Sequence, residues 1–345
     1  MNDSAGHFGT QALMGLPFEF LNAKLRGRRR HVYEGSRLRR LADCASLEEL
    51  TGWLYPRQAP LSRLSLERRL RQDCASELTA FTLYLSADVA RFYGALVRRF
   101  QVDNILVLLR LFAGGRQEPS PEQYIPELPP SLAVRSGELL ASANLAEFLG
   151  KLPEDLSRAA LRTLPLYEAA GTTAFTEMAV ERAYWDGVNR GLRLLPGAHR
   201  SACAQPIEHE RNIARLLTVL RAARHYEMRW EDLAPLLPAG DSSGDGGAGV
   251  GVSEEVLRAI HGNPSPDNVA AKVRGLARLG VPESLVELEE RLWNQVFRLA
   301  NRLYYTMPDG PAVLVGYYYV RRNELKNLTA LVEAVHYGRR FQAPE

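Results

Sequence analysis

Apolar residues recur three or four positions apart along almost the whole chain, most clearly in segments 66–100, 175–195 and 282–305. Because an α-helix has about 3.6 residues per turn, this spacing gives each helix one apolar face that packs against its neighbours. Segment 312–320 (AVLVGYYYV) is the one run with a strand-like composition, and we interpret it as the beginning of the last helix. The sequence therefore predicts an all-α fold.

The composition excludes several classes of protein. Of the 345 residues, 46% are apolar and 24% charged, which is the balance of a globular protein and not of a disordered one. Every apolar run is shorter than the roughly 18–20 residues of a membrane span, and the first residues lack the basic-then-apolar order of a signal peptide. Three cysteines without a CxxC motif argue against a disulfide scaffold, so we expect a reducing compartment.

A faint internal repeat divides the helical pattern into three. Each copy has a Glu-Arg pair near the start of an amphipathic helix, and later an asparagine followed by apolar residues at +1, +4, +5 and +8. The pairs are Glu67-Arg68, Glu181-Arg182 and Glu290-Arg291, and the asparagines are Asn104, Asn212 and Asn327. We expect the asparagines to act structurally, at a helix start or through a bond from the side-chain amide to nearby backbone. The pairs are either salt bridges between domains or solvated helix faces.

The asparagines are spaced 108 and 115 residues apart, which is far longer than the period of common helical solenoids. The sequence therefore predicts three similar helical domains: 1–118 with an N-terminal helix, 119–240, and 241–345. Segment 241–251 (DSSGDGGAGVG) is expected to form a flexible loop at the start of the third.

Positive charge is concentrated in segment 24–40, which carries eight basic residues and one acidic residue on a chain whose net charge is only +3. The candidate contact residues are Lys24, Arg26, Arg28, Arg29 and Arg30. Such a patch fits an anionic lipid head-group layer, a protein partner, a nucleic acid or simply solvent. No zinc-finger, RNP or clear helix-turn-helix pattern accompanies it, so the sequence does not favour nucleic acid.

Catalytic motifs are missing from the sequence. There is no P-loop, and the formal GxGxxG match at 244–249 follows a helix-like segment instead of a strand. A single Glu333-x-x-His336 motif is too little for a di-iron bundle, which needs two such motifs and two further glutamates. We therefore predict no catalytic residue, cofactor or metal, and keep a helical metalloenzyme only as an alternative.

The third repeat, YYYVRRNELKNLTALVEAVHYGRR, resembles the end of the C subunit of A/V-type ATPases, whose counterpart in the eukaryotic vacuolar enzyme is the d subunit. The matching features are the aromatic run 317–319, then Glu324, Asn327 and Leu328, and the Gly-basic exit at Gly338. Segments 21–26, 46–54 and 230–237 also resemble the family. The acid lies three residues before the asparagine only in the third repeat, and the family pattern leads us to expect one more short helix at the end.

The resemblance implies a non-catalytic central-stalk subunit on the cytoplasmic face of a membrane. It would be a funnel-like coupler that links the membrane proteolipid ring to the D and F shaft subunits. It would transmit torque for ion transport coupled to ATP hydrolysis or synthesis. In that setting the basic segment would contact the ring or lipid head groups, and no nucleic acid is expected. The alternative is a helical nucleic-acid-binding or regulatory scaffold that uses segment 24–40.

Overall fold

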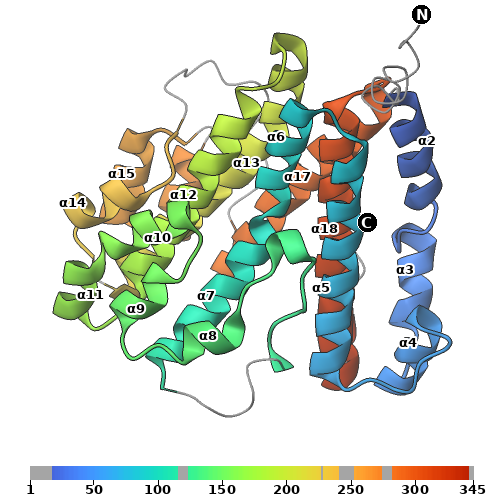
Figure 1. Cartoon of the computed structure of the whole chain (residues 1–345), viewed down its shortest axis with the longest axis horizontal. Helices are drawn as coiled ribbons and strands as arrows, with labels where there is room; N and C mark the ends of the chain where they lie inside the picture. Colours follow the sequence, from blue (N-terminus) through green and yellow to red (C-terminus); the bar gives the residue numbers. More distant parts are fainter. Residues whose placement is uncertain (1–17, 116–122, 227, 241–251, 274–281, 342–345) are drawn as a thin grey trace, which may run out of the picture. The chain divides into compact units, whose positions relative to one another are not determined.

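The computed structural model describes residues 18–115, 123–226, 228–240, 252–273 and 282–341. Within these ranges every regular element is a helix, which confirms the predicted all-α fold (Figure 1). None of the helices in the same ranges is long and apolar enough to cross a membrane. The chain forms two compact units: unit 1 combines residues 1–136 with 303–345, and unit 2 contains residues 137–302.

Unit 1 is built from the beginning and the end of the chain. Its elements are α2 (Phe18–Arg29), α3 (Gly35–Ala42), α4 (Leu47–Leu54), α5 (Arg63–Ala80), the 3-10 turn η1 (Phe81–Tyr84), α6 (Ala87–Val97), α7 (Arg99–Ala113), the 3-10 turn η3 (Pro130–Leu132) and α18 (Pro311–His336). Helices α5 and α18 lie side by side, and α2 and α4 also pack on α18 (Figure 1). The packing of unit 1 is therefore complete only when α18, the last helix of the chain, lies against α2, α4 and α5.

The strand-like run 312–320 is the first part of α18, as expected. Every side chain from Pro311 to Val320 is buried, so this part of the helix has no polar face. A helix buried on all sides has a continuous apolar run, which periodicity alone cannot distinguish from a buried strand. Pro311 occupies the first helical turn, where its missing N–H is not needed, and Gly310 before it adopts a positive φ of 89°.

The second half of α18 is amphipathic and completes an apolar cluster. Leu328, Leu331 and Val332 pack with residues of α3, α4 and α5. The members from those three helices and the turn after α3 are Leu38, Leu41, Cys44, Leu50, Leu66 and Leu70. The helical period in the sequence thus predicted the correct face of this helix for burial.

Unit 2 holds the middle of the chain. Its elements are α8 (Ser136–Leu140), α9 (Leu145–Gly150), α10 (Glu154–Leu161), α11 (Leu164–Ala170), α12 (Ala174–Leu192), α13 (Gly197–Arg221), the π-helical turn η4 (Ala222–Tyr226), α14 (Trp230–Leu233), the 3-10 turn η5 (Ala234–Leu236), α15 (Glu254–Gly262), α16 (Pro266–Lys272) and α17 (Leu285–Thr306), whose last turn belongs to unit 1. Helix α12 packs on α10 and α13, with Trp185 fully buried.

Capping residues explain where several of these helices begin. Before α4, Ser46 accepts a hydrogen bond from the Glu49 N–H, and the Glu49 carboxylate accepts one from the Ala45 N–H. Asn144 and Glu147 make the same two bonds at the start of α9. Side chains that satisfy the free N–H groups of a first turn stabilise a helix by about 1 kcal/mol.

The three repeats predicted from the sequence have no direct counterpart in the two units, and the division at 118 and 240 stays a prediction. The expected flexible loop 241–251 lies outside the described residues.

One of the two structural roles predicted for the asparagines was wrong: none of the three begins a helix. Asn104, Asn212 and Asn327 lie well inside α7, α13 and α18. The apolar residues that follow them face inward, since ten of the twelve are buried and Phe112 and Val335 are half-buried.

Candidate functional site

The basic segment 24–40 folds into the end of α2, a short turn and most of α3. Leu21 and Leu25 anchor α2, Leu38 and Leu41 anchor α3, and all four are at most 2% exposed. The Asn22 side-chain amide also donates to the Pro308 carbonyl at 3.0 Å. The basic residues therefore lie on two helices that pack against the other helices of unit 1.

The five predicted contact residues differ in how exposed they are and in which partners they have. Arg26, Arg28 and Arg30 are exposed. Lys24 is half-buried, donates to the Tyr84 hydroxyl at 2.5 Å and lies over the Tyr84 ring. Arg29 is only 8% exposed, with its guanidinium 2.6 Å from the Glu34 carboxylate. Arg29 thus helps to hold the turn between α2 and α3, and the other three arginines point to solvent.

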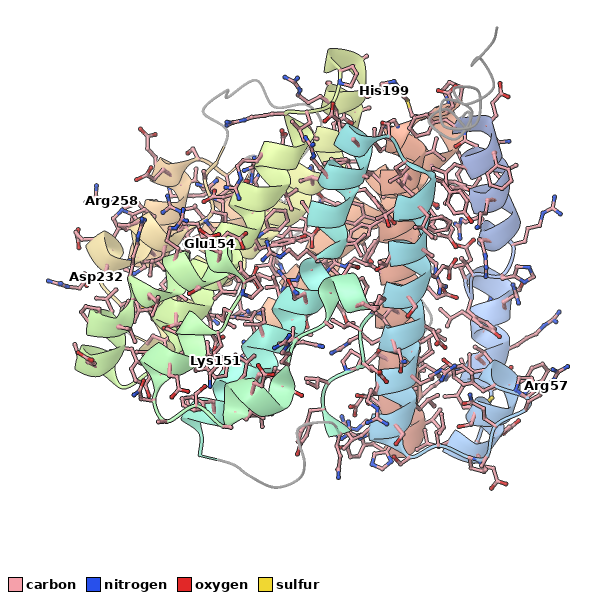
Figure 2. The ribbon with its side chains drawn as sticks, in the orientation of Figure 1. Arg57, Lys151, Glu154, His199, Asp232 and Arg258 are labelled. Carbon is pink, nitrogen blue, oxygen red and sulfur yellow. The ribbon has the colours of Figure 1, made fainter. Side chains whose placement is uncertain are left out.

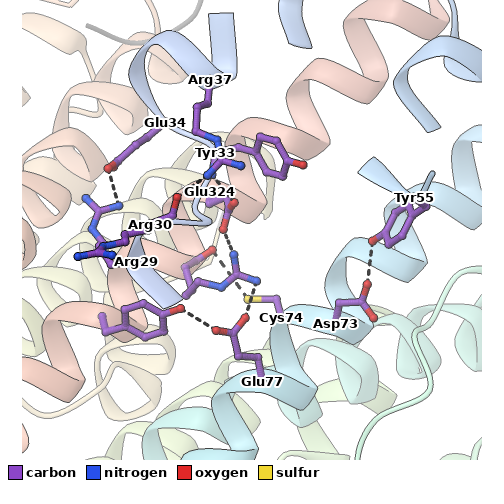
Figure 3. A network of polar contacts seen from close by, with 12 residues as sticks. Arg29, Arg30, Tyr33, Glu34, Arg37, Tyr55, Asp73, Cys74, Glu77 and Glu324 are labelled. Carbon is purple, nitrogen blue, oxygen red and sulfur yellow. Dashed lines mark hydrogen bonds and ion pairs between the residues drawn. The ribbon is translucent and has the colours of Figure 1, made fainter. Parts of the chain in front are cut away.

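Beneath the basic helices lies a buried charge network centred on Arg321 of α18 (Figure 3). Its guanidinium forms ion pairs with Glu77 of α5, at 2.9 Å, and with Glu324 one turn further along α18. The Tyr317 hydroxyl donates to Glu77 at 2.6 Å. Two carboxylates compensate one largely buried arginine, and a neutral donor supports one of them, which is the arrangement that charges removed from water need.

The network reaches the basic segment through the backbone. Tyr33, in the turn between α2 and α3, donates its N–H to the Glu324 carboxylate at 2.6 Å. Arg37 donates to the Arg30 carbonyl at 2.5 Å, and its guanidinium lies 4.9 Å from the centre of the Tyr33 ring. Figure 3 shows these contacts together around the turn. A buried carboxylate of the last helix therefore fixes the turn that connects the two basic helices.

A cavity of about 180 Å³ opens beside this network. Its polar lining includes Arg28, His31, Asp73, Glu77 and Arg321, and its apolar lining includes Leu54, Leu70 and Leu328. Asp73 accepts a hydrogen bond from the Tyr55 hydroxyl at 2.8 Å, and Arg69 lies 3.0 Å from the same carboxylate. The acids within the cavity are thus already engaged by neighbouring donors.

Two titratable groups that line this cavity, the Cys74 thiol and the Tyr317 phenol, are hard to ionise. Cys74 lines it, but burial raises the pKa of its thiol to about 11, so the thiolate needed for nucleophilic attack is scarce at neutral pH. Burial, followed by the Glu77 carboxylate, also raises the pKa of Tyr317. Among the described residues, no group of three His, Cys, Asp or Glu side chains is placed to hold a metal ion.

The Glu-Arg pairs lie within helices, one or two turns after each helix begins. In unit 1, Glu67 pairs with Arg63 at 3.2 Å within α5. In unit 2, Arg182 lies 3.9 Å from Asp186, and Arg291 pairs with Glu287. The remaining members are Arg68 and Glu181, which also make contacts, and the exposed Glu290. These ion pairs join residues four apart, as in helix-face pairs worth about 0.3–0.5 kcal/mol.

The signature asparagines have different surroundings. The buried Asn104 amide donates to the Pro126 carbonyl at 3.1 Å, which ties the segment after α7 back to the helix. Asn212 accepts from Arg215 at 3.4 Å within α13. Asn327 is 8% exposed and lies in α18 one position before Leu328. For Asn104 the amide-to-backbone bond predicted from the sequence is present.

Sequence reasoning did not identify Arg321, Glu77 or Tyr317 as members of one network. One signal was available, because Arg321 and Glu324 lie three residues apart and hence on one face of a helix. The pairing with Glu77 joins residues 244 positions apart, so no local pattern could indicate it.

The comparisons with known proteins cover nearly all of this chain. A family model described as "ATP synthase (C/AC39) subunit" matches residues 21–342. A protein named as the C subunit of an A-type ATP synthase, from Methanobrevibacter smithii, is 20% identical over 333 residues, which cover 92% of this chain and 84% of the relative. Its namesake from Methanothermobacter thermautotrophicus is 22% identical with the same coverage. The chain therefore belongs to the ATP synthase (C/AC39) subunit family.

Proposed function

We propose that this chain is a non-catalytic coupling subunit in the central stalk of a rotary A/V-type ATPase. The observation that carries the proposal is the family match over residues 21–342, on a chain whose described elements are all helices. In this role it links a membrane proteolipid ring to the D and F shaft subunits. It transmits torque between ion transport and ATP hydrolysis or synthesis without a nucleotide site of its own.

The physical properties of unit 1 support a mechanical role. Its two longest helices, α5 and α18, are held together by an apolar cluster and by a buried ion-pair network. Elements that carry load must resist bending, and close-packed helices with satisfied buried charges deform little. The exposed arginines of α2 and α3 offer a charged surface for a partner within the complex, at the cytoplasmic face of the membrane.

The test is co-purification of the tagged full-length chain from its native host after membranes are solubilised in mild detergent. We expect a small proteolipid, the shaft subunits and P-loop catalytic subunits to elute with it in fixed stoichiometry. Recovery of the chain alone, or with nucleic acid, would contradict the proposal and favour the scaffold alternative.

Two variants make this test specific. Leu331 is fully buried in the cluster of unit 1, so Leu331→Asp should unfold this unit and abolish co-purification. Arg57 is exposed and has no side-chain partner among the described residues, so Arg57→Gln should co-purify as the wild type does. Equal recovery of partners with both variants would mean that the folded unit is not what binds them.

A further inference from the structure

Five exposed arginines follow one another along α2, the turn and α3. They are Arg26, Arg28, Arg30, Arg39 and Arg40. In the described part of the chain, none of the five has a side-chain hydrogen bond or an ion pair. The acid within this stretch, Glu34, is engaged by the buried Arg29. We call these five residues the arginine face.

Several other arginines of unit 1 are paired with acids. Arg63 and Arg69 of α5 and Arg99 of α7 each lie within an ion pair with a carboxylate of their own helix, at 3.2, 3.0 and 2.8 Å. On α2 and α3, acids are found only toward the two ends, at Glu19 and just after α3 at Asp43. Arg28 also lines the cavity that contains Asp73 and Glu77, and the other four arginines are a local excess of positive charge with no acid paired to it among the described residues.

The arginine face is also held in a fixed orientation. Buried leucines pack both helices on unit 1, and the Tyr33 N–H bond to Glu324 fixes the turn between them. Figure 2 shows nitrogen-tipped side chains directed outward from α2 and α3. A surface whose backbone is already ordered loses less conformational entropy on binding than a flexible basic tail does.

Exposed aromatic residues precede and follow the arginine face along the chain. Phe20, near the start of α2, is 48% exposed, and Trp53, near the end of α4, is 59% exposed. Aromatic residues beside cationic ones are typical of surfaces that lie in the interface of a bilayer, where the rings enter the head-group region.

We propose that the arginine face, with Phe20 and Trp53, binds the phosphate head groups of an anionic lipid bilayer. The proposal rests on the proposed function, which brings this chain to a membrane complex. Each arginine near an anionic membrane surface strengthens binding by about fivefold, so five of them suffice for reversible binding. Guanidinium groups also match phosphate oxygens in a bidentate geometry.

Nucleic acid would supply phosphates too, but the structure favours lipid. Proteins that bind single strands place aromatic side chains along a basic groove, where successive bases stack on them. Here both aromatic residues lie before or after the arginine face in the chain, and the five arginines are exposed on two packed helices and the turn between them. A broad charged surface with apolar residues at its margins fits a planar bilayer better than a strand.

The test is co-sedimentation of the purified full-length chain with vesicles of phosphatidylcholine alone or mixed with phosphatidylglycerol. We expect binding only to the mixed vesicles, weakening as salt rises above about 100 mM. The double variant Arg26→Gln/Arg30→Gln should bind roughly thirtyfold more weakly. The matched control is Arg57→Gln/Arg193→Gln, which removes two exposed arginines elsewhere and should bind as the wild type does.

Several outcomes would overturn the proposal. Equal loss of binding in both double variants would point to net charge instead of the arginine face. Tighter binding to duplex or single-stranded DNA than to the mixed vesicles would identify nucleic acid as the partner. No binding to mixed vesicles, by a chain that still co-purifies with ring and shaft subunits, would refute the lipid contact and leave the proposed function intact. Trp53→Ser should weaken the part of the binding that persists at high salt.

Discussion

Helices α5 and α18 are joined by two ion-pair groups of the same composition: a more deeply buried one, called the buried group, and a more exposed one, called the half-exposed group. In the buried group, Arg321 contacts Glu77 and Glu324, and the side chains are 16%, 17% and 3% exposed. In the other group, Arg63 contacts Glu67 and Glu333, with side chains 25%, 19% and 38% exposed. Each group has one arginine and two carboxylates, and each crosses between the same two antiparallel helices.

The two groups differ in how the second carboxylate is supported. In the buried group, the Tyr317 hydroxyl and the Tyr33 N–H donate to the carboxylates. In the half-exposed group, Glu67 and Glu333 both pair with Arg63, so two acids approach each other across one arginine. Burial and the neighbouring Glu333 carboxyl therefore raise the pKa of Glu67, while Arg63 opposes the rise.

The largest difference should follow from removing each arginine. Arg321→Met leaves Glu77 and Glu324 buried without a cation, and we expect a loss of about 3–5 kcal/mol in the free energy of unfolding. Arg63→Met leaves acids that water reaches, and the loss should be about 0–1 kcal/mol. Urea unfolding of both variants measures the comparison, and similar losses would mean that burial does not distinguish the two groups.

A second prediction concerns the bond from Tyr33 to Glu324. Glu324→Gln keeps an acceptor oxygen but removes the charge that faces Arg321, and hydrogen bonds to charged groups contribute about 1.5–3 kcal/mol. The turn between α2 and α3 should then open more often, which hydrogen exchange at the Tyr33 amide would detect. Unchanged protection of that amide would show that the buried leucines alone hold the basic helices.

Part of this arrangement could be predicted from the sequence. The helical spacing predicted α18 correctly, including the strand-like run 312–320, and it placed Leu328, Leu331 and Val332 on the buried face. Such predictions work because a helix repeats every 3.6 residues whatever packs against it. The same reasoning predicts which residues share a face but not which helix covers that face, so the contact from Arg321 to Glu77 could not be inferred.

The sequence contained a signal that distinguishes Arg29 from its basic neighbours, but the prediction did not use it. In the run RGRRR it resembles its neighbours, and all of them were predicted to contact a partner. Yet Arg29 lies four residues after Leu25 and eight after Leu21, on the apolar face of α2. Helical phase thus separates the buried arginine from Arg28 and Arg30, whereas composition alone cannot.

A smaller effect is expected for Tyr317→Phe. The change removes a neutral donor from Glu77 at 2.6 Å and leaves both ion pairs of Arg321 in place. We expect a loss of about 1–2 kcal/mol, since a hydrogen bond to a charged group is lost while the ring contact with Phe81 remains. The thermal unfolding of Tyr317→Phe is compared with that of Tyr305→Phe, which alters an exposed ring. The comparison separates the loss of this bond from a general effect of losing a hydroxyl.

The smallest predicted effect depends on pH. The pKa of Glu67 is raised above 4.5, first by burial and then by its hydrogen bond to the Glu333 carboxyl, while Arg63 opposes the rise. The folded state therefore binds this proton more tightly than the unfolded state does. The contribution of Glu67 to stability is accordingly greatest at low pH and declines as pH rises from about 4.5 through the raised pKa.

Glu67→Gln tests this directly, because glutamine keeps a donor for Glu333 and removes the charge that faces it. At pH 7 the variant should be more stable than the wild type by less than about 1 kcal/mol. The advantage should vanish as the pH falls toward about 4, where Glu67 itself carries the proton. Glu290→Gln, at an exposed residue of α17, is the matched control and should show no such pH dependence. A constant difference between Glu67→Gln and the wild type across this range would mean that Glu67 stays ionised, and that the half-exposed group resembles the buried one more closely than the geometry indicates.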